Sequence, residues 1–90
     1  MCYFVYLIIS SNKTNHISYV GYTKDIKKRL ELHNKGKGAK FTKSRSWKLI
    51  YLKRYPSKII AMKEEYRLKK NYFKRKSIKE KYLKKIKNNI

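Results

Sequence analysis

The stretch YFVYLIISSNKTNHISYVGYT, residues 3–23, decides the fold of this chain. Its first part, residues 3–9, is rich in aromatic and β-branched side chains, which favour strands. A polar turn at residues 10–13 ends this run, and a second strand-like run follows at residues 17–22. Because the two runs are close in sequence, we expect an antiparallel hairpin, with its first strand at the centre of a sheet.

Helical signals and one more strand follow the hairpin. Thr23 is placed to cap a helix that runs to about Lys35, where Gly36 can end it. Residues 36–46 mix Gly, Lys, Arg, Ser and Thr without periodicity, which predicts an exposed basic loop. Residues 47–55 have the composition of a strand.

The C-terminal part predicts two helices. Pro56 and Ser57 open a helix from about Lys58 to Tyr72, and a basic amphipathic helix follows at about residues 77–89. This order of elements indicates an α/β (α+β) fold, in which a small three-stranded antiparallel sheet is flanked by helices. A chain of 90 residues suffices for one domain, which we expect to cover residues 1–90.

The charge of the chain is strongly unbalanced. Its 26 Lys and Arg residues against 5 Asp and Glu give a formal net charge of +21. Such a charge favours an anionic partner, and nucleic acid is the leading candidate. Affinity for nucleic acid should then fall steeply as the salt concentration rises. The alternative is that a biased genome composition supplies part of the lysine content.

The single cysteine, Cys2, excludes an internal disulfide and a cysteine-rich zinc site. Nothing in the sequence requires an oxidising compartment, so a cytoplasmic location fits. Residues 3–9 are apolar but too few to span a bilayer, and no basic region precedes them as it would in a secretion signal.

Two predicted helices interrupt their apolar stripes with polar side chains, which is costly unless those groups are paired or functional. On the first helix, Ile26 and Leu30 define the stripe, His33 falls within it and Arg29 lies at its edge. On the next helix, Glu65 lies within the stripe formed by residues 61, 68 and 72.

Each of these polar residues has an ordinary structural explanation. Arg29 could extend its charge to solvent, His33 could be a satisfied core imidazole, and Glu65 could pair with Lys69 at i,i+4. Taken together, the three exceptions favour a shared site, because each is expected to point at the same sheet.

These positions resemble the motifs of the GIY-YIG nuclease family. Residues 4–6 (Phe-Val-Tyr) and 19–21 (Tyr-Val-Gly) look like the two halves of its signature, although phenylalanine replaces the first glycine. Residues 21–34, with Arg29 and His33, resemble its first-helix motif, and residues 61–65 its Ala-x-x-x-Glu motif. The likeness is strongest to the small stand-alone bacterial type, which resembles the nuclease module of the bacterial excision-repair enzyme.

The resemblance implies a metal-dependent endonuclease, a hydrolase that cuts phosphodiester bonds in nucleic acid, with DNA ahead of RNA. It implies that Glu65 ligates one Mg²⁺ or Mn²⁺ ion and that Arg29 faces the scissile phosphate. Tyr6 is the candidate general base, assisted by Tyr19 or His33, and we expect the charges of nearby Arg, Lys and metal ion to favour its phenolate. The alternative for Tyr6 and Tyr19 is a stacked pair of strand tyrosines. We expect the five candidate residues to converge on one face of the sheet: Tyr6, Tyr19, Arg29, His33 and Glu65. We expect no small-molecule cofactor.

Basic and aromatic side chains alternate around these positions, a mixture that can neutralise phosphates and stack on unpaired bases. The predicted nucleic-acid contacts are Lys40, Lys43, Arg45, Lys48, Lys53 and Arg54, and the interleaved aromatic residues are Phe41, Trp47, Tyr51 and Tyr55. In the alternative interpretation the aromatic residues belong to the core and the lysines form a solvated face. We expect Trp47 and Tyr51 to be core residues of this kind.

Two other functions stay open on the sequence. One is a nucleic-acid-binding module that keeps the fold without cutting. The other is peripheral membrane binding through the last helix, where Ile78, Tyr82 and Ile86 could enter an anionic lipid surface. That helix is also what a small domain needs to close its core, so we rank membrane binding last.

Overall fold

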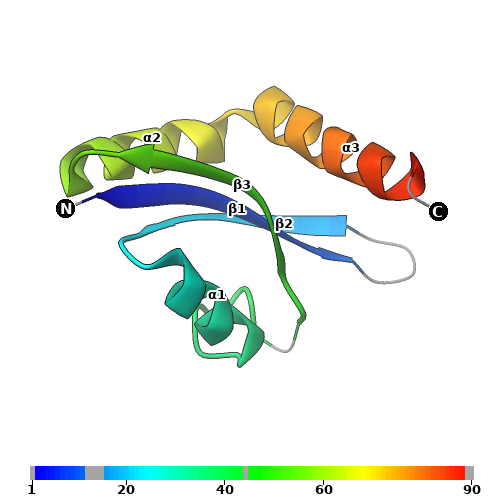
Figure 1. Ribbon diagram of the computed structural model, residues 1–90, viewed down its shortest axis with the longest axis horizontal. Coiled ribbons are helices and arrows are strands. Elements are labelled where there is room, and N and C mark those ends of the chain that lie inside the picture. The colour runs from blue at the N-terminus through cyan, green and yellow to red at the C-terminus, as the bar shows by residue number, and fades with distance from the viewer. Residues whose placement is uncertain (1, 12–15, 44, 89–90) are drawn as a thin grey trace.

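The computed structural model describes residues 2–11, 16–43 and 45–88. Its elements are β1 (Tyr3–Ser11), β2 (His16–Thr23), α1 (Ile26–Asn34), β3 (Lys48–Tyr55), α2 (Lys58–Lys70) and α3 (Tyr72–Asn88). The strands form one antiparallel sheet in the order β2-β1-β3 (Figure 1). The predicted fold class, the hairpin and the central position of β1 are confirmed. Residues 12–13 of the predicted turn lie outside the described residues.

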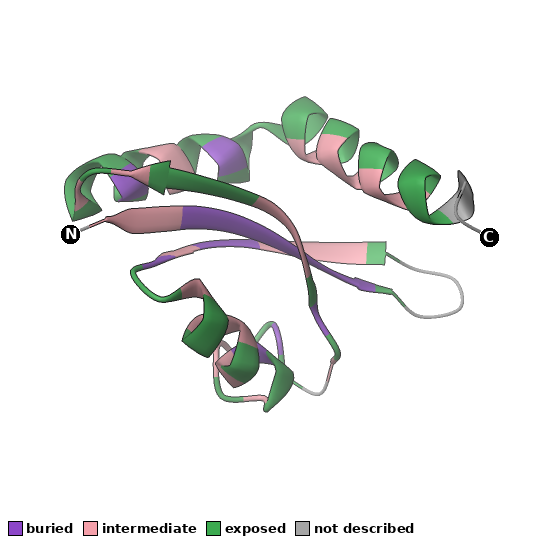
Figure 2. Ribbon diagram, viewed as in Figure 1, coloured by how far each residue is buried: buried purple, intermediate pink, exposed green. Residues whose placement is uncertain are grey.

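The two faces of the sheet are covered by different helices. Alternation along β1 turns Val5 and Leu7 toward α2 and α3, where they pack with Ala61 of α2. Tyr6 and Ile8 face the opposite side, which α1 covers (Figure 1). Figure 2 shows that burial is concentrated along β1, while the outer surfaces of the helices are exposed. The core is therefore split into two layers, and the candidate residues belong to different layers.

The start of α1 differs from the prediction. Thr23 is the last residue of β2, and the N-cap is Asp25, whose side chain accepts a hydrogen bond from the Lys28 N–H at 3.1 Å. The Thr23 hydroxyl is hydrogen-bonded to the Asp25 backbone instead. The predicted end of the helix is confirmed, because Gly36 follows it with a φ of 76°.

A single asparagine separates the last two helices. Ser57 caps α2 as expected, but α2 ends at Lys70 with Asn71 as its C-cap. The Asn71 side-chain oxygen accepts the Lys74 N–H at 3.0 Å and so begins the next helix. As a result α3 starts at Tyr72 rather than at about residue 77, and the predicted extension of α2 to Tyr72 is wrong.

The apolar stripe of α3 faces the sheet. Ile78 packs against the core layer under α2, and Tyr82 lines a hollow together with Leu49 and Ile50 of β3. In the described part of the chain, no helix is long and apolar enough to cross a membrane.

Candidate active site

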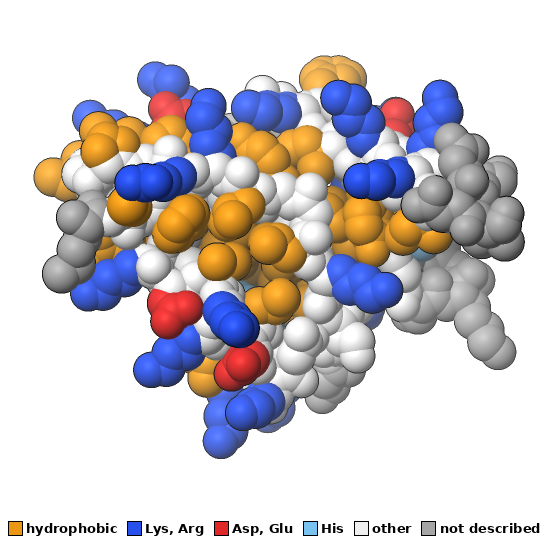
Figure 3. Space-filling view, in the orientation of Figure 1, with side chains coloured by type: hydrophobic (Ala, Val, Ile, Leu, Met, Phe, Trp, Pro, Cys, Tyr) orange, Lys and Arg blue, Asp and Glu red, His pale blue; other side chains and the backbone are white. Residues whose placement is uncertain are grey.

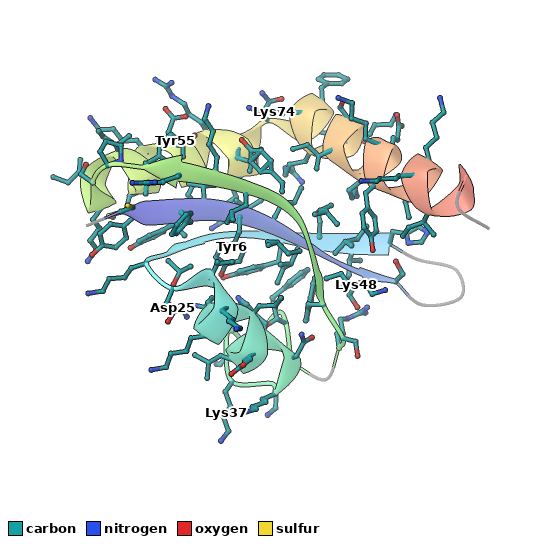
Figure 4. The ribbon with its side chains drawn as sticks, viewed as in Figure 1. Tyr6, Asp25, Lys37, Lys48, Tyr55 and Lys74 are labelled. Atoms are coloured by element: carbon teal, nitrogen blue, oxygen red, sulfur yellow. The ribbon has the colours of Figure 1, made fainter. Side chains whose placement is uncertain are left out.

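Tyr6 owes its position to the glycine beside it. It lies on central strand β1, is only 2% exposed and pairs with Gly21 of β2 in the hairpin register. A Cβ atom at position 21 would overlap the Tyr6 phenol oxygen. Glycine therefore lets the Tyr6 ring lie over β2, and Figure 4 shows this side chain between the sheet and α1.

A buried chain of hydrogen bonds leads away from Tyr6. The Tyr6 hydroxyl lies 2.8 Å from His33 Nε2, and His33 Nδ1 lies 2.8 Å from the Thr42 hydroxyl oxygen. That hydroxyl also contacts the Ala39 carbonyl oxygen at 3.0 Å. His33 is 1% and Thr42 0% exposed, so this chain is shielded from water. The expectation that His33 is buried on its helix is confirmed.

The loop that carries Thr42 is tied down at its end. The Asn34 side chain accepts the Trp47 backbone N–H at 2.6 Å, and the Trp47 indole N–H donates to the Thr42 carbonyl at 2.8 Å. Gly38 leaves the space that His33 occupies, because a Cβ atom there would overlap the imidazole. The predicted exposed loop therefore has a buried inner side, and Trp47 is core, as expected.

Burial sets the protonation of His33. Its pKa is lowered, first by removal of the ring from water and second by the Arg29 guanidinium, so the imidazole is neutral at pH 7. A neutral imidazole has one N–H. The Thr42 hydroxyl donates to the Ala39 carbonyl, so we assign the imidazole proton to Nδ1, which donates to Thr42. Nε2 is then free to accept the Tyr6 O–H.

The expectation that nearby Arg and Lys charges favour a Tyr6 phenolate is wrong. Burial raises the pKa of the Tyr6 phenol, and the neighbouring Tyr19 raises it further. Arg29 lowers this pKa, but its effect is smaller than that of burial. Tyr6 is therefore a neutral phenol in the free protein. The group placed to accept its proton is His33 Nε2, to which the Tyr6 hydroxyl is hydrogen-bonded.

Tyr6, Tyr19, Arg29 and Glu65 line one open pocket of about 410 Å³. His33 lies behind it, bonded to Tyr6 and with its ring centroid 5.1 Å from that of Tyr19. Both tyrosine rings tilt against the imidazole, in place of the simple stacked pair considered above. The structure thus brings all five predicted site residues together.

The sequence analysis expected these five residues on one face of the sheet. This expectation is wrong, because they come from both faces. Arg29 and His33 belong to α1, whereas Glu65 belongs to α2, and these helices cover opposite faces (Figure 1). The pocket also includes residues 19–23 of β2, which is an outer strand of the sheet. The two sets of side chains therefore meet at the β2 edge.

Glu65 is the one carboxylate among the described residues that line the pocket. Its side chain is 15% exposed and pairs with Lys69 at 3.0 Å, the structural alternative anticipated above. The described residues contain no cluster of three or more His, Cys, Asp or Glu that could hold a metal ion. A single carboxylate fits Mg²⁺ or Mn²⁺, because such hard ions keep several waters and share ligands with substrate phosphates.

None of the predicted nucleic-acid contacts lines this pocket. Lys40, Lys43 and Arg45 lie on the loop after α1, and Lys48, Lys53 and Arg54 lie on β3, the opposite outer strand. The cations that line the pocket are Lys24, Arg29, Lys58 and Lys69. Figure 3 shows Lys and Arg side chains around much of the outline of the viewed face, with apolar groups between them.

The sequence pattern of the GIY-YIG catalytic domain matches residues 2–82. The chain belongs to the GIY-YIG family. It is 43% identical to a UPF0213 protein of Staphylococcus aureus over 68 residues, covering 74% of this chain and 79% of that protein. A UPF0213 protein of Oceanobacillus iheyensis is 46% identical over 52 residues, covering 57% of this chain and 60% of that protein. A UPF0213 protein of Bacillus halodurans, solved in solution, is 36% identical, with a TM-score of 0.46 and coverage of 86% of this chain and 80% of that chain.

The two halves of the GIY-YIG signature are neighbours in the sheet. Tyr6 pairs with Gly21, and Tyr19 pairs with Ile8 two residues further along β1. Sequence reasoning missed Thr42 because it lies in a loop without periodicity, where no pattern marks a buried hydroxyl. It did not assign Lys24 or Lys58 to the site, and it named Lys69 only as a partner of Glu65, since only the fold brings these cations to one edge.

Proposed function

We propose that this GIY-YIG protein is a metal-dependent endonuclease that hydrolyses phosphodiester bonds in nucleic acid, DNA in the first place. The observation that supports this is the meeting of Tyr6, Arg29 and Glu65 in one pocket edged by lysines. The family membership supports nucleic acid as the substrate class. We place the protein in the cytoplasm, where its one cysteine needs no partner, and a role in DNA repair fits this activity.

Each pocket residue has a role in this proposal. Glu65 would hold the Mg²⁺ or Mn²⁺ ion, which when bound supplies positive charge to stabilise the leaving oxygen. Arg29 would contact two oxygens of the scissile phosphate through its planar guanidinium. Tyr19 would pack against His33 and keep the imidazole in register with Tyr6.

The proton path follows the hydrogen bonds of the buried chain. Tyr6 would pass its phenolic proton to His33 Nε2 and accept a proton from the attacking water. The water oxygen forms a bond to phosphorus as the bond to the leaving oxygen breaks. The positive charge that develops on His33 would be stabilised by the Thr42 hydroxyl oxygen, which accepts the hydrogen bond from Nδ1–H.

A second candidate is a nucleic-acid-binding module that has the fold but does not cut. It is favoured by the neutral state of Tyr6 and by the pairing of Glu65 with Lys69. Both observations describe groups that must change partners or protonation before catalysis.

The two candidates are separated by incubating the purified protein with linear, flapped and branched DNA and RNA. Reactions contain Mg²⁺, Mn²⁺ or EDTA, and binding to each substrate is measured in parallel. The endonuclease proposal expects cleavage of at least one substrate with metal and none with EDTA. Binding without cleavage of any substrate in the panel would make the binding module the better account.

A further inference from the structure

Phe41 is an exposed aromatic side chain next to Tyr19, which lines the pocket. It lies in the loop after α1 and is 57% exposed, although a phenyl ring in water is unfavourable. Its neighbour in the same loop, Trp47, is only 3% exposed. The loop therefore buries one of its aromatic rings and leaves the other at the surface.

The Phe41 ring packs near two other aromatic rings, those of Tyr19 and Trp47. Its centroid is 6.1 Å from that of Tyr19, with the two planes only 24° apart, and 6.4 Å from that of Trp47. Tyr19 in turn lines the pocket, and its ring centroid lies 5.1 Å from that of His33. Phe41 is thus the outermost ring of a row that ends beside Tyr6.

Charge around Phe41 suits a nucleic-acid strand. Lys40 and Lys43 are exposed on either side of it in the loop, and Arg29 lines the adjacent pocket. Surface cations of this kind contact phosphates, while an exposed ring stacks on a base that is not already paired and stacked. Bases within a duplex are not available for such stacking unless they are turned out.

We propose that Phe41 is a stacking platform for an unpaired nucleobase next to the phosphate that enters the pocket. The proposal rests on the endonuclease function and makes it more specific, because it selects single-stranded or locally unpaired nucleic acid as the substrate class. The platform acts through binding, so it is testable without cleavage.

The test is a set of binding titrations in EDTA at one fixed salt concentration. Fluorescence anisotropy follows three short labelled DNAs: a single strand, the same strand with abasic sites in its central part, and its duplex. The abasic strand keeps the phosphates and removes the bases, so it isolates stacking from charge. The variants are Phe41→Ala, Phe41→Trp and, as a matched control, Phe73→Ala, which removes a ring that is 80% exposed on α3.

The parent protein should bind the intact strand more tightly than the abasic strand or the duplex. Phe41→Ala should weaken binding of the intact strand by roughly 5- to 150-fold, the range for loss of one stacked base. Binding of the abasic strand should stay within twofold, Phe41→Trp should restore affinity, and Phe73→Ala should bind like the parent. Far-ultraviolet circular dichroism verifies that each variant is folded. If Phe41→Ala does not fold, Phe41→Leu takes its place.

The proposal is overturned if Phe41→Ala, or Phe41→Leu in its place, binds the intact strand like the parent. It is also overturned if affinity for intact and abasic strands falls by the same factor. Because no metal is present, a protein that never cuts can still pass this test. If the parent protein cuts, but Phe41→Ala shows no loss of affinity that depends on the bases, only the stacking platform is disproved.

Discussion

The His33 imidazole is hydrogen-bonded on both sides, to the Tyr6 hydroxyl through Nε2 and to the Thr42 hydroxyl through Nδ1. Both partners are nearly inaccessible to water. A solvent molecule cannot easily replace a lost partner in such a place, so the unsatisfied ring nitrogen would carry the full cost of its burial.

Thr42→Val keeps the shape of the side chain and removes only its hydroxyl. We expect this change to lower the free energy of unfolding by about 1–3 kcal/mol, because the His33 Nδ1–H loses its acceptor. Cleavage should fall as well, since the imidazole is no longer held toward Tyr6. Urea unfolding measures the first effect, and Thr42→Ser is the control that should retain most of both properties. A Thr42→Val protein as stable as the parent would show that this bond contributes nothing.

The lowered pKa of His33 predicts how stability depends on pH. In the unfolded chain the imidazole binds a proton below about pH 6.5, whereas in the folded protein it does so only at lower pH. Unfolding therefore takes up a proton in this range, and stability should decrease as the pH falls below about 6.5. Thermal unfolding midpoints between neutral and mildly acidic pH measure this, and His33→Gln should weaken the dependence. An unchanged dependence in His33→Gln would assign it to other groups.

Polar side chains that interrupt an apolar stripe predicted three of the residues that lie near one another in the fold. Arg29, His33 and Glu65 were found in this way, while Tyr6 and Tyr19 needed the resemblance to a family. The prediction of a Tyr6 phenolate went wrong because net charge is visible in a sequence and local burial is not. Thr42 carried no signal, since its burial depends on how a loop folds back over α1.

At position 21, strand β2 contributes to the site through the absence of a side chain. Gly21→Ala would place a Cβ atom against the Tyr6 phenol, which is itself held by His33. We expect a displaced Tyr6 ring and a loss of roughly 100-fold in cleavage rate, as for other small misplacements of reacting groups. In a Tyr6→Phe background the same change should cost little more, because the residue it disturbs is already inactive.

The comparison of cleavage rates in the single and double variants checks this. Equal cleavage by Gly21→Ala and the parent would mean that the ring accommodates the methyl group. A full additional loss in the double variant would mean that Gly21 acts on something other than Tyr6.

At the level of elements, the sequence indicated the strands and the order of helices correctly, with errors at their ends. The β-branched run of β1 and the glycine after α1 are strong local signals, so these predictions held. The break between α2 and α3 was predicted, but too far along the chain, because Asn71 ends one helix and caps the next within a continuous helical composition. Only backbone geometry reveals that double use.

Across the whole molecule, the net charge of +21 should dominate binding to nucleic acid. Each phosphate neutralised releases condensed counterions, so the logarithm of affinity should fall linearly with the logarithm of salt concentration, by about 0.7–0.9 per phosphate. Titrations at several salt concentrations measure this slope for the parent and for Lys58→Gln, which removes one pocket cation. The variant should have the shallower slope. A flat dependence in the parent would assign the charge to compositional bias.

The site itself is a property of the whole fold. Arg29 and Glu65 lie on helices that cover opposite faces of the sheet, and they meet at the β2 edge. Stripe analysis predicts which side of a helix is buried, but it does not tell which face of the sheet that helix covers. The convergence of these residues was therefore predictable, and their approach from two faces was not.

The central claim is that this pocket cuts phosphodiester bonds with a metal ion held by Glu65. The most direct measurement compares cleavage and binding by the parent, Glu65→Gln and Glu64→Gln on one substrate. Glu64 is the adjacent acid on α2, paired with Arg67 at 3.2 Å and absent from the pocket, so its variant is a matched control. Glu65→Gln should bind at least as well as the parent, because a negative charge near phosphate is removed, yet cut slower by orders of magnitude. Glu64→Gln should cut like the parent. Equal cleavage by Glu65→Gln and the parent would contradict the account, because the activity would then come from another site.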